Sequence, residues 1–542
     1  MLRIRYQKMI ALGIIVLMVS ACGSNRSSRG SNKSQATGWS INERGGFQYK
    51  TNYKGQDTGP GLVFIQGGTF TKGKVQDDVL RDWNNLPVRM QVRSFYMDET
   101  EVTNLMYMEY LDWLARVYGQ AGPQYKDIYT AALPDTLVWR NQLGFNEDMV
   151  NNYLRHPAFR NHPVVGVSWQ QAVNFAKWRS NRVNEKILEE KGYLARGARV
   201  ADTLSPDVNF DVETYLRASD KVYGGALVND NTEDPKFVGR ASIQRDRETD
   251  SVRISSAGIE DGILLPEYRL PTEVEWEYAA LGLSGIREYN SYQGKKKYPW
   301  SGESSRSMSR RNEGDQLANF KQGRGDYSGI AGWSNDNAEI TADVRQFPPN
   351  DFGLYGMAGN VSEWVADVYR PITNNDVSDM NYYRGNYFSK PVIGEDGKVV
   401  TATLDDNIGG TTPTGRVFFS QLPGSVLREG VDSLDTKLRS NFDRSDNRNY
   451  QDGDAFSARE NSDNMYKSPV DSDGLQRNEQ LNTLISNQTR VIKGGSWKDR
   501  SFWLDPAQRR YLPEYMAADF VGFRCAMSYL GSNPNTRKRP RG

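Results

Sequence analysis

The segment from Gly494 to Arg510, GGSWKDRSFWLDPAQRR, combines a Gly-Gly-Ser-Trp turn with the aromatic and basic side chains that suit the floor of a cleft. It contains no obvious nucleophile, redox centre or metal ligand. The segment therefore predicts a cleft without a reactive group, and the alternative is that these side chains serve packing and surface charge. The cleft residues would be Trp497, Arg500, Trp503, Arg509 and Arg510.

The two histidines offer little catalytic chemistry. His156 and His162 lie in RHPAFRNHP, where each precedes a proline, and no third metal ligand is evident nearby. A structural zinc or copper site needs more ligands than this, so structural or solvent-facing histidines are favoured. No G-x-S-x-G context supports a Ser-His-Asp arrangement.

The chain has two cysteines, and the first follows an export signal. Arg3, Arg5 and Lys8 precede an apolar run from Met9 to Val19, which is too short for a spanning helix of ~20 apolar residues. Small residues lead directly into Cys22, which resembles the lipobox of bacterial lipoproteins. We expect residues 1–21 to be the signal peptide and Cys22 to be acylated; the alternative is an ordinary signal peptide with a chance cysteine.

The sorting signal favours the periplasmic face of the outer membrane. Gly23 and Ser24 follow the cysteine, without the aspartate that suggests inner-membrane retention or the acidic run that suggests surface export. This expectation follows from resemblance to bacterial sorting rules. Cys525 is then left as a single thiol, which cannot form an internal disulfide.

Composition excludes nucleic acid as the main partner. Lys and Arg number 68 against 67 Asp and Glu, and nucleic-acid binding needs a clustered basic excess. The mean hydropathy of -0.70 is low for a chain with 11% aromatic residues. A globular core interrupted by long polar insertions would explain both values.

The chain divides into a tether, a large domain and a tail. Residues 22–59 are rich in Ser, Gly, Asn and Lys and predict a flexible tether. Residues 60–530 form the domain, with polar insertions at about 181–267 and 371–488. Residues 531–542 are a basic tail, which is either a solvated end or a docking tag for an acidic partner or lipid headgroups.

Local signals place three helices in the domain. Thr103 is expected to cap a helix that buries Leu105, Met108, Leu111 and Leu114. Ser168 is expected to cap a second helix, whose inward residues are Val173, Ala176 and Trp178. In LPTEVEWEYAALGL, Thr272 and Glu275 predict a capping box at the start of a third.

Ordered landmarks between Leu62 and Tyr529 resemble the formylglycine-generating, sulfatase-modifying domain family almost from end to end. They are GGTFTKG, FYMDETEVTN, HPVVGVSWQQAVNFAKW, YRLPTEVEWEYAA, YPWSGE, FPPNDFGLYGMAGNVSEWVADVY, RVIKGGSW and VGFRCA. The resemblance implies a mixed α/β fold with low regular secondary structure, related to C-type lectin domains, here carrying two long insertions.

The same resemblance implies that copper chemistry is absent. Enzymes of the family carry a copper-binding cysteine pair after the Gly-Gly-Ser-aromatic turn, because Cu(I) prefers thiolate ligands. The corresponding window, from Lys498 to Leu504, contains no cysteine. Cys525 matches a position outside that pair. We therefore expect a pseudo-enzyme without copper.

The family's structural calcium sites use hard oxygen ligands, as that ion prefers. The resemblance implies a first site formed by Asn319, the Phe320 carbonyl, Asp336 and the Ala338 carbonyl. A second site would use the Gly359 and Val361 carbonyls with the Glu363 carboxylate. Gly356 departs from the family pattern, since an asparagine or aspartate ligand is common there.

The lipobox, the missing cysteine pair and the insertions together resemble the gliding-motility lipoproteins of Bacteroidota. That resemblance implies a structural component of the gliding and type IX secretion machinery. Its partners would be the ring lipoprotein GldK and GldN, with the inner-membrane proteins GldL and GldM further away. Two alternatives are open: the chain corresponds to GldK itself, or it is a periplasmic lipoprotein that binds a glycan or peptide in the residual cleft.

Overall fold

The computed structural model describes most of the domain. The described ranges are 55–74, 84–119, 121–191, 209–218, 257–283, 296–330, 335–371, 388–431 (without 396 and 407) and 485–531, together with short pieces between them and before residue 55. The chain separates into two units, Met1–Lys54 and Gly55–Gly542. The signal peptide and Cys22 lie outside the described residues, as do nearly all of the predicted tail and much of the predicted tether.

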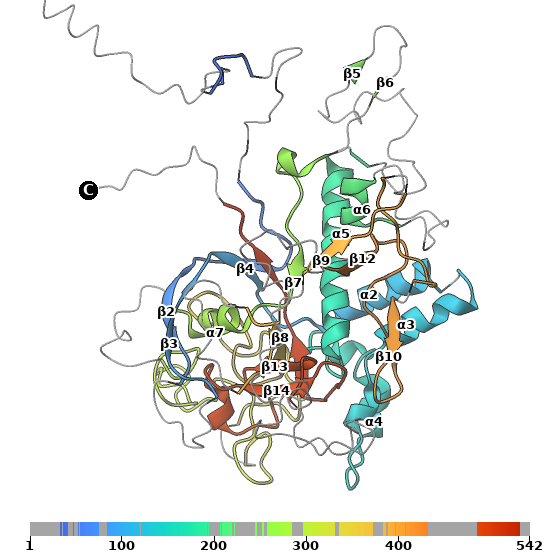
Figure 1. Cartoon of the computed structure of the whole chain (residues 1–542). Helices are drawn as coiled ribbons and strands as arrows, with labels where there is room; N and C mark the ends of the chain where they lie inside the picture. Colours follow the sequence, from blue (N-terminus) through green and yellow to red (C-terminus); the bar gives the residue numbers. More distant parts are fainter. Residues whose placement is uncertain are drawn as a thin grey trace, which may run out of the picture. The chain divides into compact units, whose positions relative to one another are not determined.

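A four-stranded antiparallel sheet joins the two ends of the larger unit (Figure 1). Its order is β1 (Leu62–Ile65), β4 (Phe95–Asp98), β16 (Ala526–Ser528) and β7 (Tyr268–Arg269). Pairing of β16 with both β4 and β7 brings the end of the domain next to its beginning. The side chain of Gln56 continues this closure, donating to the Ser528 carbonyl and accepting from the Leu530 amide.

A second four-stranded sheet lies in the core of this unit. Its order is β14 (Arg510–Pro513), β13 (Thr489–Lys493), β8 (Ser362–Val368) and β15 (Val521–Phe523), and only the β15–β8 pair is parallel. All residues of β8, β13 and β15 are buried, which explains why these strands lack an alternating polar pattern. A separate hairpin pairs β2 (Gly68–Lys72) with β3 (Val88–Val92).

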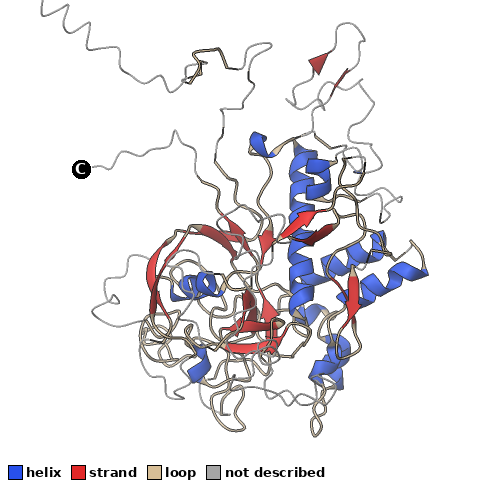
Figure 2. Ribbon diagram, viewed as in Figure 1, coloured by secondary structure: helices blue, strands red, loops and turns tan. Residues whose placement is uncertain are grey.

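The two long helices, α2 (Asn104–Val117) and α5 (Trp169–Glu190), lie next to each other (Figure 2). Aromatic residues form the contact between them. Thr103 caps α2 and Ser168 caps α5, so both predicted caps are confirmed. The predicted inward face of α2 is partly wrong, because Leu105 is exposed. The α2 side chains facing α5 include Tyr107 and Tyr110, which lie against Phe175 of α5 with ring centroids 5.7 and 5.9 Å away.

The helix α7 (Glu273–Leu281) begins with the predicted capping box. The Thr272 hydroxyl accepts from the Glu275 amide, and the Glu275 carboxylate accepts from the Thr272 amide. All nine residues of α7 are buried, including three glutamates. A helix with no solvent face must supply partners for its charged side chains, and this requirement produces the network described below.

The described parts of the two predicted insertions contact each other. The expected boundary at Asn181 falls inside α5, and α6 (Val212–Arg217) follows in the first segment. The second segment contains two antiparallel pairs, β9 (Ser389–Pro391) with β12 (Arg428–Gly430) and β10 (Gly409–Thr411) with β11 (Val417–Phe419). Arg428 of β12 pairs with Glu213 of α6 at 2.5 Å, and Ala218, Val399 and Val426 form a small apolar cluster.

The remaining elements are short: η1 (Pro123–Tyr125), α3 (Lys126–Ala132), η2 (Thr136–Trp139), α4 (Glu147–Asn152), η3 (Pro157–Phe159), β5 (Gln244–Arg245), β6 (Val252–Arg253), η6 (Ile259–Asp261) and η9 (Ser501–Leu504). Within the part of the chain that the structure describes, no helix combines the length and apolar character needed to cross a membrane.

Candidate functional site

Two glycines after β13 allow the Gly-Gly-Ser-Trp segment to turn tightly inside the core. Gly494 and Gly495 have φ values of +97° and +69°, which side chains rarely adopt. A Cβ on Gly495 would lie 2.7 Å from the Trp503 carbonyl, and one on Gly494 would lie 3.0 Å from the Trp276 ring. The turn is therefore fixed by close packing on both sides.

An ion pair fills the window after this turn. Arg510 donates to both carboxylate oxygens of Asp499 at 2.6 and 2.5 Å, and the Ser496 hydroxyl donates to Asp499 at 2.6 Å. The Arg510 guanidinium also donates to the Ser362 hydroxyl and lies 4.6 Å from the Trp503 ring centroid. The polar groups of Asp499 and Arg510 are thus satisfied within this cluster, whereas Lys498 pairs with Asp519 outside it.

Trp497 and Arg500, two other predicted cleft residues, make different contacts from this pair. Trp497 is buried and stacks on Trp139 with ring centroids 6.3 Å apart, while its indole nitrogen donates to the Asp519 carbonyl. Arg500 is exposed at the start of η9. The structure brings Trp503 and Arg510 together, but it does not gather the five residues into one group.

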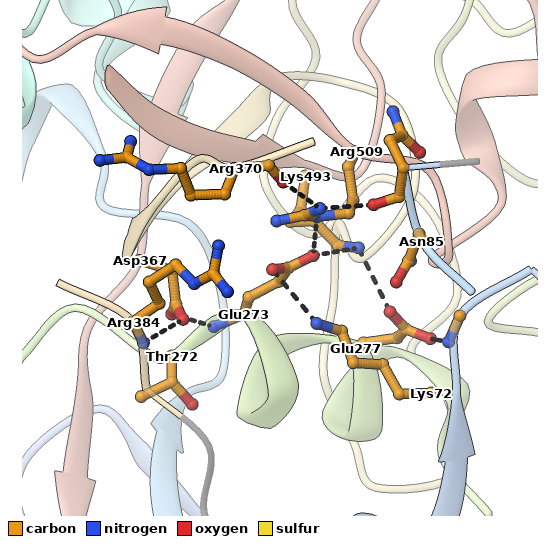
Figure 3. A network of polar contacts seen from close by, with 12 residues as sticks. Lys72, Asn85, Thr272, Glu273, Glu277, Asp367, Arg370, Arg384, Lys493 and Arg509 are labelled. Carbon is orange, nitrogen blue, oxygen red and sulfur yellow. Dashed lines mark hydrogen bonds and ion pairs between the residues drawn. The ribbon is translucent and has the colours of Figure 1, made fainter. Parts of the chain in front are cut away.

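Arg509 lies in a different place, within a buried network of charged residues (Figure 3). Its Nε is 2.6 Å from Glu273 Oε1, and its Nη1 donates to the Arg370 carbonyl at 3.1 Å. Arg509 and Arg510 therefore make separate sets of contacts. Arg509 is a structural residue of the buried core.

The network centres on two glutamates of α7. Glu273 lies 3.3 Å from Lys72 and 3.6 Å from Lys493, and Glu277 lies 3.3 Å from Lys493. Burial alone would raise the pKa of Glu273, but Arg509, Lys72 and Lys493 outweigh it and hold that pKa below its usual range. The network joins α7 to β2, β13 and the start of β14, so its most direct role is to hold these elements together.

Asp367 of β8 closes one side of the network (Figure 3). Its carboxylate accepts from the Glu273 amide at the start of α7 at 2.7 Å and from the Arg384 amide at 3.0 Å. Burial and the neighbouring Glu273 raise the pKa of Asp367 to about 6. The carboxylate thus satisfies one of the free amides at the N-terminus of α7.

Cys525 is fully buried between β15 and β16. Its amide donates to Asp98 Oδ2 at 2.8 Å, and Asp98 is held by Arg179 through two contacts of 2.8 Å. Burial and the Asp98 carboxylate raise the pKa of the Cys525 thiol well above its usual value. A reactive cysteine requires a lowered pKa and solvent access, so this thiol is suited to packing.

The residues of the first implied calcium site fit a hard cation. Asp336 is buried, and its Oδ1 accepts from the Ala338 amide at 3.2 Å, whereas its Oδ2 has no hydrogen-bond partner among the described residues. Burial raises the pKa of Asp336 to about 6. Asn319 is also buried, and its side-chain amide is oriented by donating to the Ile340 carbonyl at 2.7 Å. A bound calcium ion would supply the missing partner of Asp336, with the Phe320 and Ala338 carbonyls as further ligands.

The residues of the second implied site do not fit. The Glu363 carboxylate accepts from Arg524 Nε and Nη2, both at 2.7 Å, and from the Trp276 indole at 2.8 Å. Its charge is therefore already neutralised by a buried guanidinium. Gly359 and Val361 lie on the same segment, but the carboxylate that would complete a site with their carbonyls is committed to Arg524.

Sequence reasoning missed Glu101, which occupies the space beside Gly356. A Cβ on Gly356 would lie 2.3 Å from Glu101 Oε1, so the glycine makes room for this carboxylate. Glu101 is fully buried; Asn360 donates to Oε1 at 3.1 Å, and Oε2 has no partner among the described residues. Burial raises the pKa of Glu101 to about 8, although Arg524 opposes this effect. The signal that the sequence offered was Gly356, a glycine at a position where the family often has an asparagine or aspartate ligand.

We expect Glu101→Gln to become increasingly stabilising relative to the wild type as the pH rises from about 5 to 8. The folded carboxyl keeps its proton to higher pH than the unfolded one, so the wild type loses stability with a slope of up to about 1.4 kcal/mol per pH unit over this window. Urea unfolding at several pH values measures this difference. A constant difference across the window would show that Glu101 is ionised in the folded protein.

The histidines serve the local structure. His156 Nδ1 accepts from the Ala158 amide at 3.2 Å, and His162 Nδ1 lies 2.9 Å from the Thr341 hydroxyl. Burial lowers the pKa of His162. Across the described ranges, no group of three or more His, Cys, Asp or Glu side chains is arranged to hold a metal ion.

Comparison with known protein families identifies the class of the domain. Residues 48–403 match the family described as the sulfatase-modifying factor enzyme 1-like domain. This match covers more than half of the chain, and the protein therefore belongs to that family.

Individual relatives share shorter regions with this chain. The formylglycine-generating enzyme of Mus musculus is 36% identical over 99 residues, which cover 18% of this chain and 22% of that enzyme. The formylglycine-generating enzyme of Streptomyces coelicolor is 24% identical over 339 residues, covering 59% of this chain and 70% of that enzyme. A protein named inactive C-alpha-formylglycine-generating enzyme 2, from Mus musculus, is 36% identical over 118 residues, covering 22% of this chain and 30% of that protein.

Similar solved structures include PvdO from Pseudomonas aeruginosa, with a TM-score of 0.36 and 15% identity over 86% of this chain and 94% of PvdO. Several curated relatives are covered only in small part: the chain spans 22% of the mouse enzyme and 28% of a serine/threonine-protein kinase, pkn1, of Chlamydia pneumoniae.

Proposed function

We propose that this protein is an outer-membrane lipoprotein of the GldJ type, which acts as a non-catalytic structural component of the gliding-motility and type IX secretion machinery. Its lipid anchor is Cys22, and it faces the periplasm. Its partners are GldK and GldN, with GldL and GldM reached indirectly. The domain serves as a rigid platform in this assembly.

The observation that carries the non-catalytic part of the proposal is the state of the cysteines. The chain contains two cysteines; Cys22 follows the predicted signal peptide, and Cys525 is fully buried with a raised pKa. A two-thiolate copper site cannot be built from one buried thiol. The window after the Gly-Gly-Ser-Trp turn is filled by the Asp499–Arg510 pair, which favours a structural role for that segment.

A variant without the buried thiol tests this part of the proposal in cells. We expect Cys525→Ala to restore gliding and secretion to a strain that lacks the gene, because the protein's role needs no reactive thiol. Restoration close to the wild-type level is predicted, since the alanine keeps the buried Cβ. Loss of function with a normal amount of folded protein would contradict the proposal, as would turnover of a cysteine-containing peptide by the purified chain with copper and oxygen.

The proposal includes one structural calcium ion, at Asp336. We expect calcium at 100 times its dissociation constant to stabilise the protein by about 2.7 kcal/mol. Asp336→Asn should abolish this gain, whereas Glu363→Gln should leave the metal-dependent gain in place while lowering stability in both conditions. Thermal unfolding with calcium or with chelator measures both effects. An equal response of wild type and Asp336→Asn would contradict the assignment.

A further inference from the structure

A cavity of about 370 Å³ opens beside α5, away from the Gly494–Arg510 segment. Trp169 and Val173 of α5 form one wall, and Leu270 and Ala366 contribute further apolar surface. The volume is in the range of small-ligand sites, which are mostly apolar with a few polar groups that orient the ligand.

The indole of Trp169 is held rigidly at this wall. Its nitrogen donates to the Val365 carbonyl at 2.9 Å, and the Arg490 guanidinium lies 3.8 Å from the centroid of its ring. Because both contacts come from buried strands, the wall is formed before any ligand arrives. A preformed aromatic surface reduces the entropy lost on binding.

One carboxylate in the cavity has no partner. Glu267 is exposed to the cavity and, among the described residues, forms no hydrogen bond or ion pair. By contrast, Arg269 and Glu275, which also line the cavity, bind each other at 2.7 and 2.8 Å. Surrounding protein raises the pKa of Glu267. The other charged groups nearby are Lys177, Asp211, Glu213 and Arg428, together with the Arg269–Glu275 pair, and their charges balance, so Glu267 leaves a surplus negative charge.

We propose that this cavity binds a lysine or arginine side chain presented by a partner protein. The apolar wall would cover the aliphatic stem, and Glu267 would pair with the positive group. Long basic side chains combine these two properties, an apolar stem and a charged end. This inference deepens the proposed scaffold function, on which it rests, by assigning the chemistry of one contact.

A side chain carried by a partner protein is favoured over a free amine because of how the cavity can be reached. Glu267 is exposed, so its carboxylate can be reached from the protein surface. A polypeptide lying on this surface can insert one long side chain while its own backbone stays outside the cavity. A free amine would use only the cavity itself.

Calorimetry with the peptide acetyl-Leu-Lys-Leu-amide tests the proposal on the purified full chain. The norleucine counterpart of the peptide serves as the uncharged control. We expect the lysine peptide to bind at least tenfold more tightly than its counterpart, and Glu267→Gln to remove this preference. Glu395→Gln, which changes an exposed carboxylate outside the cavity, should have no effect.

Val173→Phe provides a second, independent variant, because a phenyl ring at this half-buried position would fill the cavity. It should abolish binding of both peptides without lowering the thermal midpoint. Equal binding of both peptides, or binding unaffected by Glu267→Gln, would overturn the proposal. So would no binding at millimolar peptide.

A chain lacking residues 532–542 distinguishes the partner from the protein's own basic tail. If removing the tail raises the affinity for the lysine peptide tenfold, the tail competes for the cavity and the assignment to a partner is wrong. An unchanged affinity supports a partner. Failure of these binding experiments would leave the proposed function standing, because membrane anchoring and assembly are measured separately.

Discussion

Replacing Glu273 by alanine is expected to destabilise the folded protein by about 3–5 kcal/mol. The substitution leaves Arg509, Lys72 and Lys493 in the core without their shared carboxylate, and Glu277 would be the remaining glutamate of α7 beside Lys493. A buried charge without a partner costs far more free energy than the lost contact itself. The midpoint of urea unfolding, compared with the wild type, measures this loss.

An exposed ion pair supplies the matched control. Glu147 binds Arg140 at 2.8 Å, but both side chains are largely exposed. Solvent screens such pairs, so Glu147→Ala should change the stability very little. If Glu273→Ala were as mild as this control, the network in Figure 3 would not hold α7 to its neighbouring strands.

The second large effect is expected at Cys22. Cys22→Ser should release the protein from the membrane fraction almost completely, because acylation supplies two or three chains and each buried methylene contributes about 0.8 kcal/mol. The wild type should remain with outer membranes after washing with high salt, since the proposed anchoring by acyl chains is hydrophobic. Fractionation and immunoblotting measure the distribution.

Substitution of the other cysteine is the control for this experiment. Cys525→Ala should remain with the membranes, since this residue is buried within the domain. Retention of Cys22→Ser in washed membranes would contradict lipid anchoring. Retention lost on washing with high salt would instead indicate an electrostatic association, for which the basic tail is the natural candidate.

Local signals could be predicted from the sequence because they depend on a few neighbouring residues. The caps at Thr103, Ser168 and Thr272 are each defined within three positions, and the structure confirms all three. The buried face of α2 was partly mispredicted, because an apolar count favours leucine. Leu105 is exposed, while Tyr107 is buried and stacks on Phe175.

Long-range partners could not be predicted, because nothing in the local sequence identifies them. Glu273 meets Lys72 and Arg509 from segments about 200 residues away in either direction. The five residues predicted to share a cleft lie within one short segment, and this closeness in sequence suggested a common surface. In the structure, however, the neighbours Arg509 and Arg510 contact different parts of the core. The lining of the Glu267 cavity likewise comes from four separate segments of the chain, 169–176, 267–275, Ala366 and Tyr383.

We propose that this domain is a structural component of a membrane assembly. Chemical crosslinking in gently solubilised outer membranes, followed by purification and mass spectrometry, would reveal its neighbours. We predict crosslinks from described surfaces such as 209–218 and 388–431 to a ring lipoprotein or a periplasmic motor component. Recovery of an isolated monomer, with no crosslink to another protein, would contradict the claim.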